Sequence, residues 1–517
     1  ALTGGRPPVI RASILVGSFL MSVWLRRVSQ PINTLSVAAF ILILLNPDHI
    51  FSIGVQLSFL AVATLILCGQ RSASHEPLDE SERQDERLTE LMDSGKTRIF
   101  LFARQLMNML GKMLWFSACV TLVCLPLVWY QFHVVSPISL IVNVILGPCL
   151  FVALAAGLLV IATGMLHDSL AIVPGWICSV TLDWMQWVMT VAARIPLGHA
   201  WLPSPPGYWI VVFYILLAAS FLFRPVRRWD AWFRYLWIGI WIPVAYLLAT
   251  VGRGVPAETL EGTFLNVGHG TCVILRMPQN EVWLYDCGRL GNESYSSAGI
   301  DTALWSMGVT QLDGIILSHA DSDHFNALPG ILQRFQVDRV ITPPGMLAES
   351  EPALIPIREA MQRFQIDVLE VNRDAIPVNF PQIFRVLHPP LKRLSGSDNA
   401  NSLVLQIDWQ GNSVILPGDL EPPGTAMLIN MPRPKPGGVL MAPHHGSLRM
   451  KAASVLHWAR PQKTVVSGGQ RARKPEVREM LSAHGSAVHI TAVAGAIRVR
   501  IGKHGDVDIQ EWSCAGW

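Results

Sequence analysis

The chain has 517 residues and a formal net charge of +3, with 51% hydrophobic and 15% charged residues. Soluble domains carry roughly 25% charged residues, so this composition excludes an ordinary soluble protein over the whole length. The net charge is too small to favour a charged partner. The eight cysteines include no C-x-x-C spacing, which argues against a disulfide framework or a cysteine zinc site.

The hydrophobic residues are concentrated in the first half of the chain. Crossing a bilayer takes about 20 apolar residues in a helix, and these segments mostly lack the polar stripe of a soluble amphipathic helix. We therefore predict a multi-span α-helical membrane domain over residues 1–251, rather than a large soluble helical core. The two segments nearest the N-terminus are short and could also be re-entrant. The candidate spans lie near residues 11–25, 33–46, 52–69, 113–132, 138–165, 170–193, 207–223 and 234–251.

The distribution of Lys and Arg over the loops predicts an orientation. The loop at 223–234 is rich in arginine and is expected in the cytoplasm, whereas 195–207 has no Lys or Arg and is expected outside. The same alternation places a charged loop at about 71–112 in the cytoplasm and everything after residue 251 outside the cytoplasmic (inner) membrane. Within the spans, Gln56 is the polar residue with the best claim to line a transport path.

From about residue 256 the sequence changes to short β-type segments with helices between them, which predicts an α/β domain over 256–517. Helices are expected at 298–308 and 327–335. Polar residues gather just after several of the strands, and loops held by rigid strands are a common place for a functional site. The predicted strands are 262–268, 271–278, 281–288, 313–319, 337–343, 401–409, 412–419, 437–445, 463–469 and 487–495.

The most informative motif is "LSHADSDH", which follows a buried strand. It places His319, Asp321, Asp323 and His324 within six positions. Imidazole and carboxylate groups are ligands for divalent zinc or manganese, and a solvated turn would rarely hold so many of them. The motif therefore predicts a metal site.

Two later motifs supply further ligands of the same kinds. "ILPGDLE" places Asp419 directly after a strand, and "APHHGS" places His444 and His445 after another. With these residues the set is large enough for two divalent ions, zinc or manganese, bridged by a carboxylate. The sequence leaves open whether His444 or His445 is the ligand.

In this order, after "LYDCG", the motifs resemble the metallo-β-lactamase fold, an αββα sandwich. Asp321 stands where most members of that superfamily have a histidine. This variant resembles the one in ComEC-type DNA-internalisation (competence) proteins. "LTGGRPPVIRASIL" and "LILLNPDHIFSIGVQLSFLAV" are similar to the competence membrane domain of that family. Because the chain begins at Ala1, we expect that an N-terminal part is missing.

The resemblance implies residue roles as well as a fold. It makes His319, Asp321, Asp323, His324, Asp419 and one or both of His444 and His445 metal ligands. Asp286, Asn401 and Ser402 match positions that support the ligands from outside. The sequence also departs from the family pattern: "VGHGT" places His269 and Thr271 where Gln and Asp are usual, and Lys474 stands where a late histidine is expected.

The function implied is DNA uptake across the inner membrane during natural transformation. The soluble domain would be a metal-dependent phosphodiesterase that degrades the strand not transported. Asp323, His445 and Lys474 are the candidates for proton transfer and charge stabilisation. The expected partners are DNA, the lipid bilayer and other proteins of the competence machinery. Two alternatives stay open: a DNA channel whose soluble domain binds DNA or a partner without cleaving it, and a membrane-anchored hydrolase of another ester.

Overall fold

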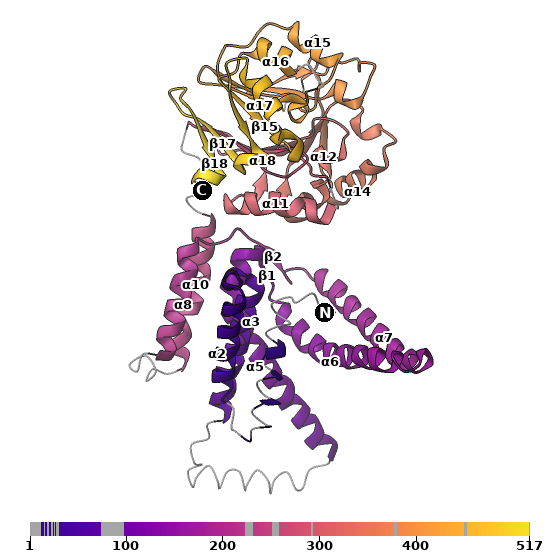
Figure 1. Ribbon diagram of the computed structural model, residues 1–517, viewed down its shortest axis with the longest axis vertical. Coiled ribbons are helices and arrows are strands. Elements are labelled where there is room, and N and C mark those ends of the chain that lie inside the picture. The colour runs from indigo at the N-terminus through magenta and orange to yellow at the C-terminus, as the bar shows by residue number, and fades with distance from the viewer. Residues whose placement is uncertain are drawn as a thin grey trace. The chain divides into compact units, whose positions relative to one another are not determined.

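The structure, a computed structural model, divides into two compact units, residues 1–241 and 242–517 (Figure 1). The predicted boundary at residues 251–256 lies outside the described residues and stays a prediction. The structure describes residues 12–14, 16–17, 20–21, 24, 26, 30–73, 98–222, 231–250, 258–290, 293–376, 380–448 and 452–515.

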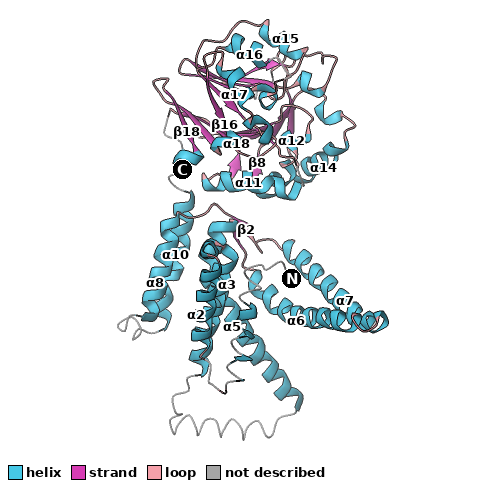
Figure 2. Cartoon of the chain, viewed as in Figure 1, coloured by secondary structure: helices cyan, strands magenta, loops and turns pink. Residues whose placement is uncertain are grey.

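The first unit consists of helices and one pair of very short antiparallel strands, β1 (Val134–Val135) and β2 (Ala200–Trp201) (Figure 2). Each apolar segment predicted from residue 33 onward lies on one of the helices, whereas seven of the fifteen residues of the segment 11–25 lie outside the described residues. The helices are α2 (Pro31–Leu45), η1 (Pro47–Phe51), α3 (Ile53–Ala73), α5 (Arg98–Phe132), α6 (Ser139–Gly164), α7 (Asp168–Ala193), α8 (Gly207–Leu222) and α10 (Ala231–Thr250), whose last residues pass into the second unit.

The predicted charged loop at 71–112 is shorter than expected, because α3 continues to Ala73 and α5 already begins at Arg98. Residues 98–110 contain neither Gly nor Pro, and extending an existing helix costs much less than starting one. The sequence of this segment also predicts a short helix near 86–92, which lies outside the described residues.

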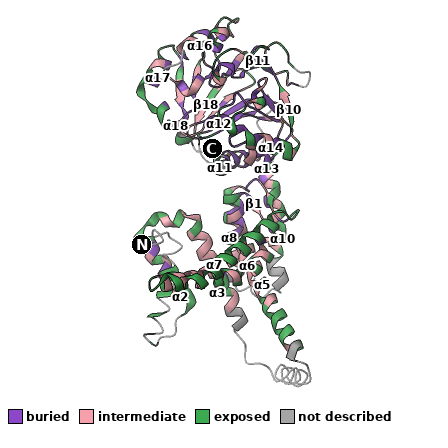
Figure 3. Cartoon of the chain, turned by 90° about the vertical axis from the view of Figure 1, so that its right-hand side faces the viewer, coloured by how far each residue is buried: buried purple, intermediate pink, exposed green. Residues whose placement is uncertain are grey.

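By length and composition, Phe100–Phe132 and Ser139–Gly164 could each cross a bilayer, with mean hydropathies of 1.8 and 2.7. Large apolar side chains lie exposed along α6 and α7, among them Phe151, Leu158 and Trp176 (Figure 3). Water would solvate such a surface poorly, whereas lipid tails would cover it. The number of spans and their orientation stay predictions.

The second unit is built around two sheets, each with helices on its outer side (Figure 2). The larger sheet has eight strands in the order β10-β9-β7-β5-β4-β3-β17-β18, and the smaller has six in the order β11-β12-β13-β14-β15-β16. The strands of the larger sheet are β3 (Leu260–Phe264), β4 (Cys272–Arg276), β5 (Val282–Cys287), β7 (Gly314–Ile316), β9 (Arg339–Thr342), β10 (Asp367–Glu370), β17 (Ile497–Ile501) and β18 (Val507–Glu511). Those of the smaller sheet are β11 (Phe384–His388), β12 (Val404–Trp409), β13 (Asn412–Leu416), β14 (Val439–Met441), β15 (Lys463–Val466) and β16 (Ala487–Ile490).

The main core lies between the two sheets, where Val273, Tyr285 and Ile316 of the larger sheet pack with Leu405 and Met441 of the smaller. Side chains alternate between the two faces of a strand, so the intervening residues point outward to the helices. A second core forms in this way between the smaller sheet and its helices α15 (Gly424–Ile429), α16 (Ala452–Ala459) and α17 (Pro475–Ser482). Helices α11 (Glu293–Ser306), α13 (Leu328–Arg334) and α14 (Ile355–Phe364) accompany the larger sheet.

The predicted αββα sandwich is therefore confirmed, with differences in single elements. The strand predicted over 487–495 ends at Ile490, and Thr491–Ala494 forms the short helix α18. The sequence analysis missed β10, β11, β17 and β18. In β17, Arg498 and Arg500 alternate with apolar residues and approach the buried Glu261, which explains how a strand of the larger sheet can carry two arginines.

Candidate metal centre

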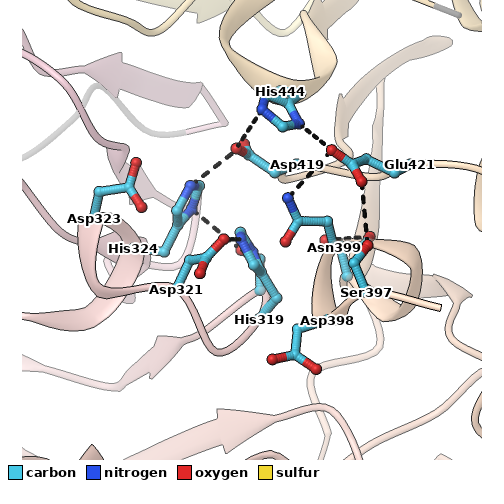
Figure 4. A network of polar contacts seen from close by, with 12 residues as sticks. His319, Asp321, Asp323, His324, Ser397, Asp398, Asn399, Asp419, Glu421 and His444 are labelled. Atoms are coloured by element: carbon cyan, nitrogen blue, oxygen red, sulfur yellow. Dashed lines mark hydrogen bonds and ion pairs between the residues drawn. The ribbon is translucent and has the colours of Figure 1, made fainter. Parts of the chain in front are cut away.

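Loops from both sheets bring most of the predicted ligands together (Figure 4). Strand β7 leads into the turn that carries His319 and His324, and the parallel strand β5 carries Asp286 at its next-to-last position. In the smaller sheet, the neighbouring strands β13 and β14 lead to Asp419 and His445. Because the carboxyl ends of parallel strands meet at one edge of a sheet, residues far apart in sequence converge there.

The converging side chains form two groups. His319, His324 and Asp419 make one, and His269, Asp323 and His445 make the other; within each group the ligand atoms lie within 4.8 Å of one another. Asp419 contacts both, since its Oδ1 is 3.3 Å from His324 Nε2 and its Oδ2 is 3.3 Å from His445 Nε2. A carboxylate that faces two groups of nitrogen and oxygen atoms is suited to bridge two cations.

Three of the histidines are oriented in the same way. Each has a polar partner at Nδ1, namely Ser318 Oγ at 2.9 Å for His319, Asp286 Oδ2 at 2.7 Å for His324 and the Ser467 carbonyl at 2.8 Å for His445. Their Nε2 atoms are buried and have no hydrogen-bond partner among the residues that the structure describes. Buried polar atoms are normally paired, and metal-binding histidines are held through their other ring nitrogen. The donor set and its orientation therefore fit divalent ions.

Asp286 holds this arrangement in place. Its side chain is fully buried and accepts hydrogen bonds from the Ser318 amide at 2.7 Å and the Ser318 hydroxyl at 2.8 Å, besides its contact with His324. Its φ of 56° lies in the left-handed region, which is uncommon for a non-glycine residue and costs free energy. In this backbone conformation the carboxylate contacts Ser318 and His324 in the turn that carries the ligands.

The charges of the centre depend on one another. Burial alone would raise the pKa of Asp323, but the close approach of His445, whose Nε2 is 3.3 Å from Asp323 Oδ2, and the charge of His324 outweigh it and lower the pKa to about 2. Asp419 is also buried, and the charges of His324 and His445 lower its pKa despite the burial. In return, Asp419 and Asp286 raise the pKa of His324 against the effect of burial, and Asp419 and Asp323 raise that of His445. In the metal-free centre, the neighbouring carboxylates therefore favour the protonated forms of His324 and His445.

Two predicted ligands lie at the rim of the centre. The side chain of Asp321 is 53% exposed, with Oδ2 3.4 Å from His319 Nε2. His444 points its Nδ1 to Glu421 Oε1 at 2.8 Å, and its Nε2 is 4.0 Å from Asp419 Oδ2. His445, the better buried of the adjacent histidines, thus points into the centre. Glu421, which the sequence analysis did not single out, contacts His444 from outside.

The remaining predicted residues lie further out. Asn401 bonds to the backbone of the preceding loop at Leu394 and Ser397, and the Ser402 hydroxyl donates to the Asn399 carbonyl. Both residues shape the loop at 394–402, and Asn401 lines a small pocket that His319 also lines. Lys474 is exposed at the start of α17.

His269 is the residue of the centre that the sequence analysis did not place among the ligands. It was noted only as a departure in "VGHGT". A single histidine between two glycines gives no pattern from which to predict a ligand. Burial and the neighbouring His445 lower its pKa, against the raising effect of Asp323.

Comparison with known proteins supports both units. Residues 1–227 match the family model of the competence protein, and residues 265–469 match that of the metallo-β-lactamase superfamily. ComE operon protein 3 of Bacillus subtilis (strain 168) is 26% identical over 525 residues, covering 96% of this chain and 62% of that protein. Competence protein ComA of Neisseria gonorrhoeae is 25% identical over 515 residues, covering 98% of this chain and 63% of the relative.

Among solved structures, a diphosphatase of the PhnP family is similar, with a TM-score of 0.29 and 13% identity over 47% of this chain and 98% of that one. Zn(2+)-bound PqqB from Methylobacterium extorquens has a TM-score of 0.29 and 11% identity over 43% and 85%. The chain spans only 62% and 63% of the two curated relatives. The chain matches the competence model and then the metallo-β-lactamase model, and in this order of domains it is similar to the ComEC-type competence proteins.

Proposed function

We propose that this protein serves DNA uptake across the inner membrane and that its second unit is a two-metal phosphodiesterase acting on the incoming DNA. The observation that carries the proposal is the pair of ligand groups sharing Asp419, with buried and unpaired histidine Nε2 atoms aimed between them. Membership in the metallo-β-lactamase superfamily implies divalent metal and hydrolysis in general. The competence domain suggests DNA as the substrate.

In this proposal His319, His324 and Asp419 hold one ion, and Asp323 and His445 hold the other with Asp419 shared between them. Asp321 and His444 stand at the rim, where they could complete a coordination sphere or contact the substrate. Divalent ions in such a site supply an activated hydroxide near neutral pH and neutralise charge on a phosphoryl group. Zinc and manganese both suit this mixed nitrogen and oxygen donor set.

The protein's own residues supply orientation and proton handling. Asp286 fixes the ring of His324, and Ser318 does the same for His319, so the donor nitrogens are preorganised. Asp323, with its low pKa, stays ionised at neutral pH and can accept a proton only transiently. Arg471 and His269 line an open pocket next to the second ligand group, and a phosphodiester backbone could lie there. Lys474 stays a candidate for charge stabilisation.

We further propose that residues 1–251 span the inner membrane and place the metal centre outside it, where DNA arrives. Gln56 donates from Nε2 to the Ile50 carbonyl at 2.8 Å and borders an apolar pocket between α2, α3 and α8, so it stays a candidate for the transport path. Labelling of single exposed cysteines introduced after residue 258 is expected from the outer side only. Labelling from the cytoplasmic side alone would contradict the proposed orientation.

The enzymatic proposal is tested on the purified full chain with labelled single- and double-stranded DNA and either manganese or zinc. Cleavage is expected in the wild type and not in Asp323→Ala. Equal cleavage by both proteins would contradict the proposal.

Transport is tested separately with Asp419→Ala in a transformable host. If uptake is lost while the variant remains in the membrane at the normal level, the centre is needed for transport. DNA uptake by Asp419→Ala together with no cleavage by the wild type would instead support a channel whose soluble domain is not a nuclease.

A further inference from the structure

His269 lies on the loop between β3 and β4, and backbone contacts hold this loop against the metal centre. The amide of Thr271 donates to the Asp323 carbonyl at 3.2 Å, and the amide of Leu290 donates to the His269 carbonyl at 2.8 Å. On the other side, the Ser467 hydroxyl donates to the Gly270 carbonyl at 3.4 Å. The backbone around His269 is thus tied to Asp323 on one side and, on the other, to Ser467, whose carbonyl orients His445.

The glycines beside His269 make this close approach possible. Gly270 has a φ of 140°, and a Cβ atom there would lie 2.5 Å from the Gly288 carbonyl oxygen and 2.6 Å from that of Asp323. Gly469 approaches from the smaller sheet, where a Cβ atom would lie 3.2 Å from the His269 nitrogen. A loop that packs this tightly fixes the starting point of the His269 side chain, although the side chain itself is 37% exposed.

The imidazole points to the second ligand group. His269 Nε2 is 3.7 Å from Asp323 Oδ2, and its ring centre is 5.0 Å from that of His445. The first distance is too long for a hydrogen bond. It is close to the separation of roughly 3.3–3.4 Å between two ligand atoms on one tetrahedral ion with bonds of about 2.0–2.1 Å. His445 Nε2, which is buried and unpaired, lies 3.3 Å from the same Asp323 oxygen.

We propose that His269 is a direct ligand of the second metal ion, together with Asp323 and His445 and with Asp419 as the shared carboxylate. This inference rests on the proposed two-metal function and adds a ligand at a position where the family pattern has glutamine. An imidazole nitrogen binds zinc more strongly than an amide oxygen does, whereas oxygen ligands suit manganese. The second site of this chain therefore prefers zinc.

The test uses the metal-free full chain, titrated with zinc and with manganese while bound metal is counted. The wild type binds two ions. In His269→Gln one zinc affinity falls by about tenfold or more, since even indirect supports of a metal ligand are worth 10–100-fold. The other site is unchanged, and the manganese affinity of the weakened site changes less than its zinc affinity. The matched control is His504→Gln, an exposed histidine between β17 and β18.

A second variant separates ligation from a structural role. His269→Ala removes the ring from a partly exposed position, so added imidazole can occupy its place and restore zinc affinity. A merely structural histidine would not be replaced in this way. Unchanged zinc affinities in His269→Gln would overturn the inference while leaving the two-metal proposal intact. A wild-type chain that binds no ion would contradict the proposed function and this inference with it.

Discussion

Asp286 Oδ2 lies 2.7 Å from His324 Nδ1, and both side chains are completely buried. The contact joins the end of β5 to the turn after β7, and it orients the imidazole so that Nε2 faces Asp419. Because the same carboxylate also binds the backbone and the hydroxyl of Ser318, one residue organises most of the first ligand group. Asp286 is therefore the support on which the geometry of the centre depends most.

Replacement of Asp286 by asparagine is expected to weaken metal binding without removing any ligand. The neutral amide is a poorer acceptor for the ring N–H of His324, and such supporting residues contribute about 10–100-fold to metal affinity. Titration of the metal-free full chain with zinc measures this loss. Asp508→Asn, an exposed carboxylate on β18, is the control. An affinity within twofold of the wild type would show that Asp286 does not support the centre.

The metal-free protein is expected to lose stability at both ends of the pH scale. The pKa values of His324 and His445 are raised in the folded protein, so their contribution is fully present below the unfolded value of about 6.5 and is lost as pH rises through the folded values. The pKa of Asp323 is lowered to about 2, so its contribution is present above roughly pH 3.9 and is lost as pH falls towards 2.

Melting temperatures of the chain in chelator, measured across this range, test the expectation. Zinc replaces the protons on His324 and His445, so bound zinc should abolish the loss of stability at alkaline pH. For the same reason the zinc affinity should rise with pH. A metal-free protein whose melting temperature keeps rising above pH 7 would contradict the assigned charges.

Gly288 is expected to tolerate no side chain. A Cβ atom there would lie 2.1 Å from the carbonyl carbon of Asp323 and 2.2 Å from the His324 amide nitrogen, so Gly288→Ala must displace the ligand turn. We expect a destabilisation of about 1–3 kcal/mol, the usual cost of overpacking, together with weaker metal binding. Gly299→Ala is the control, because no atom of the described part of the chain lies within 4 Å of its Cβ position in α11 and alanine favours a helix. Equal melting temperatures of the two variants would exclude this packing.

The open pocket beside His269 predicts that the side chains of Arg471 and Lys474 contribute differently to DNA binding. Arg471 lines this pocket, whereas Lys474 lies at the exposed start of α17. Arg471→Ala is expected to weaken DNA binding and to reduce the slope of log affinity against log salt by about 1, as for one lost phosphate contact. Binding assays at several salt concentrations compare it with Lys474→Ala. A larger loss in Lys474→Ala would favour the role that the family position implies for Lys474.

Most of the centre could be predicted because its ligand-type residues lie in short sequence motifs that can be recognised without the structure. Histidines and aspartates crowd into 319–324 after an apolar strand, and Asp419 and His445 follow apolar strands too. No such signal marks His269, whose place depends on the packing of Gly270 against a turn some fifty positions later in the chain. The same holds for Glu421, whose relation to His444 arises from the ends of two neighbouring strands.

The fold shows the same contrast. The buried strands β5 and β7 were predicted because short, mainly apolar runs bounded by polar residues and glycine are typical of buried strands in an α/β domain. Strand β17 was missed because two arginines, Arg498 and Arg500, are typical of a surface segment. Their ion pairs with Glu261 on the neighbouring strand become evident only in the structure. Likewise, α5 begins about fifteen residues earlier than the apolar segment, since helix propagation does not require apolar residues.

Loops from both sheets are proposed to hold two divalent cations around Asp419. Anomalous diffraction from crystals of the full chain with zinc tests this arrangement most directly, because the peaks locate the ions and their ligands together. We expect two peaks, one on each side of Asp419: the first beside His319 and His324, and the second beside Asp323 and His445. Peaks found only at exposed carboxylates, with none next to Asp419, would contradict it.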